Sequence, residues 1–255
     1  MKAELLDQQV LAMYDVRGIQ SYIFKSNAAK EIVGASVLVE KIITEGLREY
    51  VSIQKKNLST YMMDWKKDNP KAFLEDQEIE MQIMFIGGGN AYVLFRHGRE
   101  CEKVNRFLAK YLLDRTYSLN LAVAVVSKTE DYKKDYDAIN NKMREIKASM
   151  PLSMPVGAMS FMAVDTITGY PLTSKDTKGN YYSTEASLKR AAFPKMEDEK
   201  LFDNMITEKG DSSTLAVFHI DGNSMGNTIR NTMKDIRGYE DAVSYTHLRA
   251  HETLM

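Results

Sequence analysis

The order of apolar patterns along the chain most constrains how it can fold. Four short apolar runs have the length and composition of β-strands, and they cover residues 10–16, 79–86, 91–96 and 119–127. Two longer stretches, residues 29–54 and 99–115, repeat apolar residues at helical spacing, and each lies between two of these runs. Strand, helix, strand, strand, helix, strand is the order of the ferredoxin-like fold. We therefore predict an α+β domain of βαββαβ type over residues 8–150, which ends in a third amphipathic helix at about residues 130–149.

The chain changes character after this third helix. Prolines and glycines recur between residues 151 and 212, which predicts a connecting module of short strands and loops. An apolar strand pattern returns just before Asp221 and Gly222, and the first strand pattern also ends in an aspartate, Asp15, before a glycine turn. We interpret residues 213–241 as the first strand and helix of a second domain of the same kind.

The last residues, 242–255, are expected to be a non-native tail. The segment Ala242–Thr253 does not continue the second pattern, and its codons can be written as a match to a transposon-type sequencing adapter. Segments of this origin are set aside in reasoning about the fold. The chain would then be a truncated form of a longer protein, whose natural sequence continues differently beyond Asp241.

Composition narrows the class of protein. The formal net charge is −1 without a basic cluster, which argues against binding to duplex DNA but leaves local contacts to a nucleotide or RNA open. Cys101 is the single cysteine, so the sequence predicts no internal disulfide and no zinc site built on cysteines. No apolar run approaches the roughly 18 residues of a membrane span, and the amino terminus is too polar for a secretion signal. We expect a soluble, cytoplasmic protein without a membrane partner.

Asp221 and Asp15 are the candidate metal ligands. Each ends a buried strand pattern and lies shortly before a glycine, so that the carboxylate can bind Mg²⁺ or Mn²⁺ while the glycine backbone approaches a phosphate. In palm-type nucleotidyl transfer, such an acid works with a second carboxylate pair to hold two metal ions. The alternative is that Asp221 caps the following helix through its backbone amides.

The turn Gly87-Gly88-Gly89-Asn90 separates two strand patterns and predicts a β-hairpin. It carries no carboxylate, and Asn90 offers only a neutral carbonyl, so we expect the first domain to bind a metal ion poorly. Its backbone amides are candidates for holding a base or a phosphate, and a plain turn is the alternative. The corresponding nucleotide-binding candidates after Asp221 are Gly222 and Asn223.

Several segments resemble the polymerase-like large subunit of type III CRISPR effector complexes, or a stand-alone minimal relative of it. They are Gly18–Phe24 with Gly34-Ala35-Ser36, the Gly87–Asn90 turn, Thr168–Thr173 and Asp221–Gly226. The resemblance covers about residues 8–235 and implies two palm domains joined by a linker. This chain departs from the family because it shows no amino-terminal nuclease domain and no zinc-binding cysteines between the palms.

The resemblance also implies an activity in antiviral defence. The second palm of that family converts ATP into cyclic oligoadenylate, so the parent of this chain is expected to be a metal-dependent nucleotide cyclase. Its implied partners are ATP, RNA and the subunits of an effector complex. The family's acidic catalytic hairpin lies later in the chain, and the fragment itself is expected to be inactive. Two alternatives stay open: a non-catalytic scaffold or sensor that binds a nucleotide or RNA, and a signalling enzyme of the diguanylate-cyclase type that uses GTP.

Overall fold

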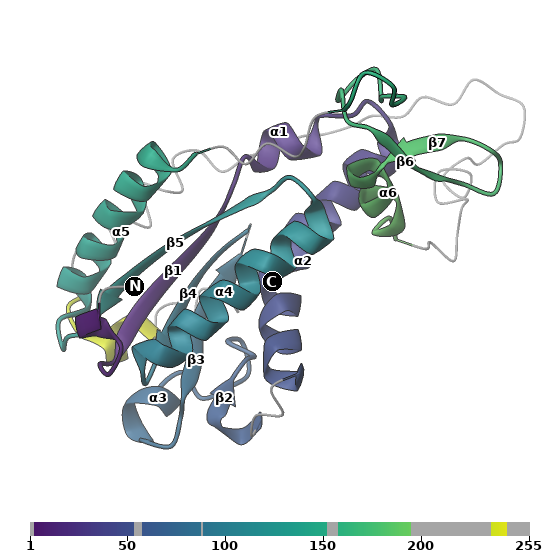
Figure 1. The fold of residues 1–255 in the computed structure, drawn as a ribbon. Helices are drawn as coiled ribbons and strands as arrows, with labels where there is room; N and C mark the ends of the chain where they lie inside the picture. Colours follow the sequence, from purple (N-terminus) through teal and green to yellow (C-terminus); the bar gives the residue numbers. More distant parts are fainter. Residues whose placement is uncertain (1–2, 54–57, 88, 152–157, 195–235, 244–255) are drawn as a thin grey trace, which may run out of the picture. The chain divides into compact units, whose positions relative to one another are not determined.

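A five-stranded mixed sheet organises the chain (Figure 1). Its strands are β1 (Val10–Arg17), β2 (Tyr61–Met62), β3 (Met81–Gly87), β4 (Asn90–Phe95) and β5 (Asn120–Ser127), in the order β2-β3-β4-β1-β5. β1 pairs antiparallel with both β4 and β5, β3 and β4 form an antiparallel hairpin, and β2 adds a short parallel edge beside β3. This order, apart from β2, is that of a ferredoxin-like βαββαβ domain, and it confirms the predicted α+β palm-like fold.

The computed structural model describes residues 3–53, 58–87, 89–151, 158–194 and 236–243. The chain divides into two units, and every described residue except Pro194 belongs to the unit formed by residues 1–193 and 236–255. The helices are α1 (Ile19–Ile23), α2 (Ala29–Ile53), α3 (Ala72–Glu75), α4 (Gly98–Thr116), α5 (Tyr132–Ser149) and α6 (Thr184–Ala191), with 3₁₀ turns at Ala3–Leu5 and Leu58–Thr60. None of the helices in the described ranges is long and apolar enough to cross a membrane.

The main core lies between the sheet and the helices α2 and α4. Alternate residues of β1 face it because strand side chains point to opposite faces in turn, and these are Val10, Ala12, Tyr14 and Val16. They pack with apolar side chains of the two helices, among them Ile42, Leu47, Val104 and Leu108. On the other face of β1, Leu11 and Met13 are buried and Asp15 and Arg17 are partly buried, and α5 packs against β1 and β5. The sheet is therefore covered on both faces.

Local capping explains where two helices, α5 and α6, begin. The side chain of Asp131 accepts a hydrogen bond from the backbone N–H of Lys134 at the start of α5. Ser183 accepts one from Ala186 in the same way at the start of α6. These short oxygen-bearing side chains satisfy amide groups that have no partner within the helix. α6 follows a two-stranded hairpin of β6 (Leu172–Lys175) and β7 (Tyr181–Ser183).

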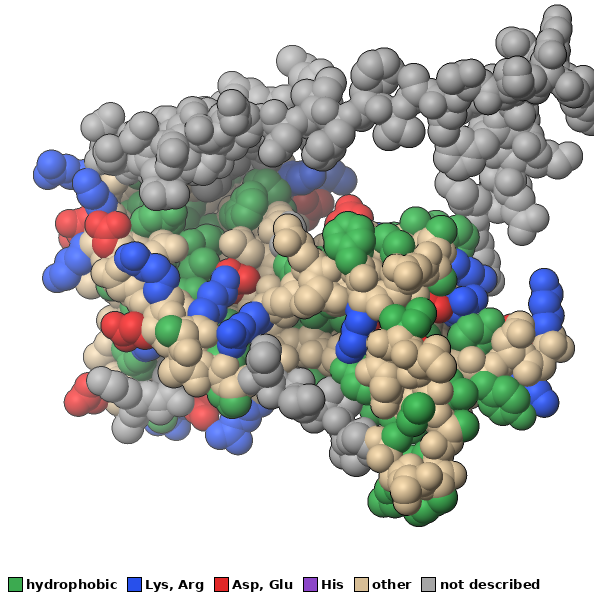
Figure 2. Space-filling model, turned by 90° about the horizontal axis from the view of Figure 1, so that it is seen from above, with side chains coloured by type: hydrophobic (Ala, Val, Ile, Leu, Met, Phe, Trp, Pro, Cys, Tyr) green, Lys and Arg blue, Asp and Glu red, His purple; other side chains and the backbone are tan. Residues whose placement is uncertain are grey.

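Apolar side chains are unevenly distributed over the surface. On the face seen in Figure 2, they gather at the end that carries β6, β7 and α6, while many of the charged side chains lie at the other end. The exposed large apolar residues of residues 159–181 are Met159, Phe161, Met162, Val164, Ile167 and Tyr181.

The segment Ile236–Val243 packs beside the start of α5 (yellow in Figure 1). The Tyr132 N–H donates to the carbonyl of Arg237 at 2.7 Å, and the Tyr239 hydroxyl donates to Oδ2 of Asp135 at 2.6 Å. Most of the predicted second-domain segment 213–241 and of the predicted tail 242–255 lies outside the described residues. The part of the tail that is described, Ala242 and Val243, is buried.

Candidate functional site

The end of β1 and the β3–β4 turn meet at one edge of the sheet. Asp15 of β1 lies opposite Asn90 of β4, and Asn90 in turn lies opposite Gly87 of β3. The N–H of Val16 donates to the carbonyl of Gly89 at 2.8 Å. Four residues that the sequence singled out are therefore neighbours: Asp15, Gly87, Gly89 and Asn90. The other predicted site residues, Gly88, Asp221, Gly222 and Asn223, lie outside the described residues.

Two glycines with positive φ allow this meeting. Gly89 has φ +82°, and a Cβ placed there would lie 2.7 Å from Cδ1 of Ile19. Gly18 has φ +79° and precedes α1, whose first residue is Ile19. Because only glycine adopts this backbone region without strain, each turn needs its glycine. The Gly18-Ile19 segment thus packs directly on the glycine-rich turn.

Asn90 carries an unsatisfied acceptor at this edge. Its side-chain oxygen Oδ1 is buried and has no hydrogen-bond partner. A buried acceptor without a donor costs roughly 1–3 kcal/mol, so such groups in folded proteins usually meet water or a ligand. The amide carbonyl accepts from N–H or O–H groups. A ligand with an amino or hydroxyl group, such as a nucleobase or a ribose, would supply the missing donor.

Among the described residues, one acid and two bases lie close together at this edge. Lys147 in the last turn of α5 donates to Oδ2 of Asp15, and the two side chains are partly exposed. Arg17 donates through Nη1 to the carbonyl of Met150 at 2.7 Å. The charge of Lys147 offsets the charge of Asp15. The charge of Arg17 therefore gives these described residues a net positive charge balance. Such a balance favours an anionic ligand, for example a phosphate.

The residues around Asp15 do not fit a divalent metal ion. Within the described ranges, no group of three or more His, Cys, Asp or Glu side chains could hold a metal. Mg²⁺ requires an octahedral set of oxygen ligands, and a carboxylate whose oxygen is taken by an ammonium contributes little to it. The prediction of Asp221 as a metal ligand falls outside the described residues.

Two tyrosines line the neighbouring face. Tyr92 lies two residues beyond Asn90 on β4 and therefore points to the same side of the sheet. Its ring stacks on Tyr136 of α5 with 6.0 Å between ring centres and 21° between planes. Burial, then the neighbouring Tyr136, and more weakly Asp15, raise the pKa of the Tyr92 hydroxyl well above its usual value. The Tyr92 hydroxyl therefore stays neutral at physiological pH.

Two further segments of the resemblance, Gly34-Ala35-Ser36 and Thr168–Thr173, lie near the place where α6 packs on α2. A Cβ at Gly34 would lie 1.8 Å from the backbone oxygen of Lys189, so only glycine allows α6 this close. Lys25 donates to the Tyr170 hydroxyl at 2.6 Å, and Tyr170 packs edge-on against Tyr117 at 5.6 Å. Both segments therefore belong to one junction, in which the connecting module packs on the first domain.

A buried ion pair lies in this junction. Lys189 and Glu185 are each 1% exposed, with 2.6 Å between Nζ and Oε1. Ser118 donates to the other carboxylate oxygen of Glu185 at 2.6 Å. Burial lowers the pKa of Lys189, while the Glu185 hydrogen bond acts against that shift. We did not expect this pair from the sequence; the i, i+4 spacing was a signal, but such pairs are usually exposed.

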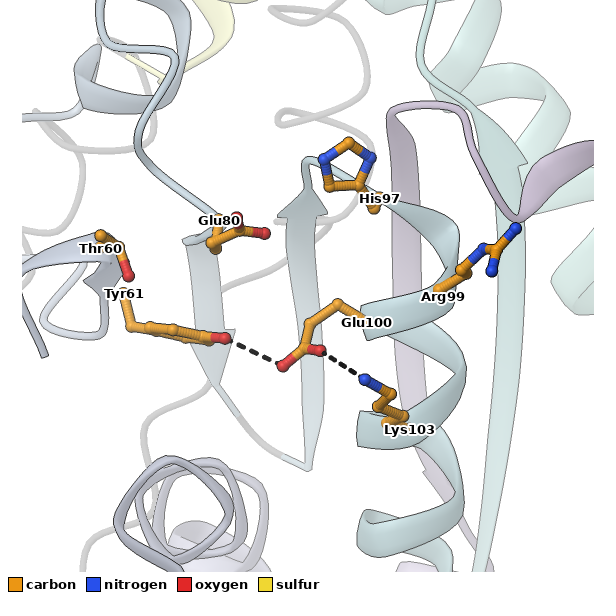
Figure 3. A pocket seen from close by; sticks show the side chains of 7 residues that line it. All are labelled: Thr60, Tyr61, Glu80, His97, Arg99, Glu100 and Lys103. Atoms are coloured by element: carbon orange, nitrogen blue, oxygen red, sulfur yellow. Dashed lines mark hydrogen bonds and ion pairs between the residues drawn. The ribbon is translucent and has the colours of Figure 1, made fainter. Parts of the chain in front are cut away.

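A separate cavity of about 420 Å³ lies at the start of α4 (Figure 3). Figure 3 shows Tyr61 and Lys103 pointing toward Glu100, while His97 and Arg99 point away from it. The Glu100 carboxylate accepts from the hydroxyls of Tyr50 and Tyr61, both at 2.9 Å. Burial and these bonds raise the pKa of both tyrosines. The network joins α2, β2 and α4, and we assign it a structural role.

Comparisons with known proteins find structural neighbours only. No family model matches the chain, and no curated protein matches it. The crystal structure of an apo Csm1–Csm4 cassette matches with 14% identity and a TM-score of 0.39, over 58% of this chain and 20% of the other. The same cassette in complex with pppApA matches with 15% identity and a TM-score of 0.39, over 56% and 19%. The complex with AMPPNP matches with 16% identity and a TM-score of 0.38, over 56% and 19%. This chain thus spans about a fifth of the length of those it matches.

Proposed function

We propose that this chain contains a nucleotide-binding palm domain of a longer cytoplasmic protein, with ATP as the first nucleotide to test. The observation that carries the proposal is the buried, unpartnered Oδ1 of Asn90 beside a glycine-rich turn. The resemblance of Gly18–Phe24 and the turn to polymerase-like CRISPR subunits supports the same reading.

Each group of residues at this edge has a specific role in binding the nucleotide. Asn90 accepts a hydrogen bond from the base or the ribose, and the turn brings backbone amides toward the ligand. Arg17 and Lys147 supply positive charge for the phosphates. Tyr92 and Tyr136 form an aromatic wall on the same side of the sheet.

For the parent protein, we propose a metal-dependent nucleotide cyclase in antiviral defence. Asp221 would hold Mg²⁺ or Mn²⁺, which would supply positive charge for activating the attacking hydroxyl and for steadying the leaving pyrophosphate. Gly222 and Asn223, which follow Asp221 in sequence, are the residues that we propose to contact the nucleotide bound there. This chain carries no second carboxylate pair on its Gly87–Asn90 hairpin, so we expect it to bind nucleotide without turning it over. Subunits of an effector complex are the proposed partners.

A non-catalytic scaffold that binds a nucleotide or RNA is the second candidate. It is favoured by the neutral Asn90 at the position where a catalytic hairpin would carry acids. The two candidates agree on binding at this edge and differ in whether the parent transfers nucleotidyl groups. Short RNAs are therefore tested beside ATP.

The first experiment measures ATP binding to the full chain by isothermal titration calorimetry. We expect Asn90→Ala to weaken binding roughly fivefold, which corresponds to about 1 kcal/mol for one hydrogen bond. Asn141→Ala is the matched control, because Asn141 lies exposed on α5 and away from the turn in sequence.

The possible results separate the candidates. ATP binding that depends on Asn90 supports the nucleotide site. RNA binding without ATP binding supports the scaffold. If the intact chain binds neither ligand, or if Asn90→Ala binds ATP as tightly as the unchanged protein, the proposed site is wrong.

A further inference from the structure

The Asp15 carboxylate has a fixed cation as its partner. We propose that the edge formed by Asp15, Asn90 and Lys147 is a metal-independent site, in which the Lys147 ammonium takes the place that a divalent cation would occupy at Asp15. The role of this edge in holding a nucleotide rests on the proposed function above. The exclusion of the metal rests on the geometry around Asp15 alone.

The arrangement depends on two elements far apart in sequence. Asp15 is on the side of β1 that faces α5, because Tyr14 and Val16 point into the core on the other side. The last turn of α5 then brings Lys147 to Oδ2 of Asp15, across 132 positions of sequence. The side chain of Asp15 is 17% exposed and that of Lys147 is 37% exposed, so the pair is partly shielded from solvent.

The neighbours of this pair offer little to a divalent cation. Asn90 opposite Asp15 contributes a neutral carbonyl, and Arg17 two residues along β1 adds positive charge. A dication at Asp15 would have to displace Lys147 and, among the described residues, would meet one carboxylate, so it would be held weakly. Mg²⁺ and Mn²⁺ sites in proteins instead combine carboxylates with further oxygen ligands.

The ammonium supplies a different chemistry from a metal ion. Lys147 is a compact charge with three donors on a flexible stem, so it can bind Asp15 and a phosphate oxygen together. The ligand is then held by charge and hydrogen bonds, without an ion that polarises a phosphorus–oxygen bond. The site is suited to binding a nucleotide rather than transferring its phosphate.

The test counts Mn²⁺ ions bound to the full chain by electron paramagnetic resonance. The proteins are the unchanged chain, Asp15→Asn, Lys147→Met, Lys147→Arg and the double variant Asp15→Asn/Lys147→Met. Any Mn²⁺ bound at Asp221 is common to all five and cancels in the comparison. Lys147→Met keeps the aliphatic stem and removes the charge, while Lys147→Arg keeps the charge.

We expect the unchanged chain, Asp15→Asn and Lys147→Arg to bind the same number of Mn²⁺ ions. Lys147→Met should gain one weakly held ion, because loss of the ammonium frees the Asp15 carboxylate beside the Asn90 carbonyl, and the double variant should bind this ion at least about tenfold more weakly. A Mn²⁺ site in the unchanged chain that needs Asp15 would overturn the proposal. So would a folded Lys147→Met variant, checked by circular dichroism, that gains no ion.

A second readout keeps this inference apart from the proposed function. ATP affinity of the unchanged chain should differ by less than about twofold between EDTA and Mg²⁺, a shift under 0.5 kcal/mol. Strong dependence on Mg²⁺ that disappears in Asp15→Asn contradicts the metal-independent site. Absence of ATP binding contradicts the proposed function alone, since the Mn²⁺ counts decide the role of Lys147 without nucleotide.

Discussion

At the residue scale, Cys101 shows how burial controls reactivity. The thiol is fully buried on α4, and its sulfur accepts from Nδ2 of Asn105 at 3.5 Å. Asn105 in turn accepts from the Tyr14 hydroxyl at 2.7 Å. Burial raises the pKa of Cys101 to about 12, although the neighbouring hydrogen bonds act in the opposite direction. The thiolate, which is the reactive form, is therefore scarce in the folded protein.

We predict that Cys101 resists thiol reagents while the protein is folded. At pH 8, its reaction with Ellman's reagent should be at least about 100-fold slower than in denaturant, because burial and the raised pKa both suppress the thiolate. The denatured protein is the control, since Cys101 is the single cysteine. Equal rates in the two states would show that the α4–β1 contact is open.

The same pKa shift gives a dependence of stability on pH. The folded state holds the Cys101 proton more tightly than the unfolded state, whose thiol has its ordinary pKa of 9.0. This contribution is therefore present below pH 9 and is lost as the pH rises toward 12. Urea unfolding of Cys101→Ala should show a weaker loss of stability over this alkaline range than the unchanged chain.

At the element scale, the contact between α2 and α6 depends on one missing side chain. Gly34 lies inside α2, where alanine would ordinarily be favoured by about 1 kcal/mol. A Cβ at this position would nevertheless lie 1.8 Å from a backbone oxygen, that of Lys189. The close approach also brings Arg190 of α6 to Glu31 of α2, with 2.7 Å between Nε and Oε1. The glycine is kept by tertiary packing against its helix propensity.

We predict that Gly34→Ala destabilises the protein by about 1–3 kcal/mol, the usual range for overpacking. Gly46→Ala is the comparison, since Gly46 lies in the same helix. A Cβ there would meet side-chain atoms of Leu108 and Tyr111 rather than a backbone atom, and because side chains can shift its effect should be smaller. Urea unfolding of both variants measures the difference. A Gly34→Ala variant as stable as the unchanged chain would mean that α6 does not pack in this position.

The segment between α2 and β3 contains the short helix α3. Neither the helical nor the strand spacing of apolar residues indicated this helix. Phe73 of α3 is buried, and its ring lies 3.9 Å from the Arg96 guanidinium. Arg96 also donates to the carbonyls of Phe73, Asp76 and Ile79 at 2.7, 2.8 and 3.1 Å. One buried arginine thus anchors a charged segment to the sheet. A four-residue helix is too short for its period to be detected in sequence.

At the scale of the whole molecule, residues 236–243 belong with the first domain in space. Ile236, Tyr239, Ala242 and Val243 are buried, and the Tyr239 ring packs edge-on against Tyr132 with 5.1 Å between ring centres. Asp135, which accepts from Tyr239, is itself buried and also accepts from the backbone N–H of Thr129 at 2.6 Å. A distant segment thereby completes the packing around the start of α5.

We predict that Tyr239→Phe destabilises the full chain by about 1–2 kcal/mol, because a buried carboxylate loses a hydrogen bond. Tyr181→Phe is the matched control: Tyr181 is 58% exposed, and its loss of a hydroxyl should change stability by less than about 0.5 kcal/mol. Thermal unfolding measures both. If the two variants have the same midpoint of thermal unfolding, residues 236–243 do not contribute to the folded core.

The sequence by itself determined the βαββαβ order and the glycine-rich turn after β3. These features depend on local rules, namely the two side-chain periods and the backbone freedom of glycine. The sequence also indicated Asp15 and Asn90 as candidates, because both lie at strand ends. Their register across β1 and β4 follows from pairing the two strands with their apolar faces on the same core.

Only the tertiary structure decided the partners of these residues. Nothing in the sequence singles out Lys147 for Asp15, Glu100 for the hydroxyls of Tyr50 and Tyr61, or the Lys189 carbonyl for Gly34. Each contact joins elements that meet only after the helices have packed on the sheet, and its energy depends on burial and on distances of a few tenths of an ångström. The charge beside Asp15, and with it the chemistry of the site, is set by where the last turn of α5 lies on the sheet.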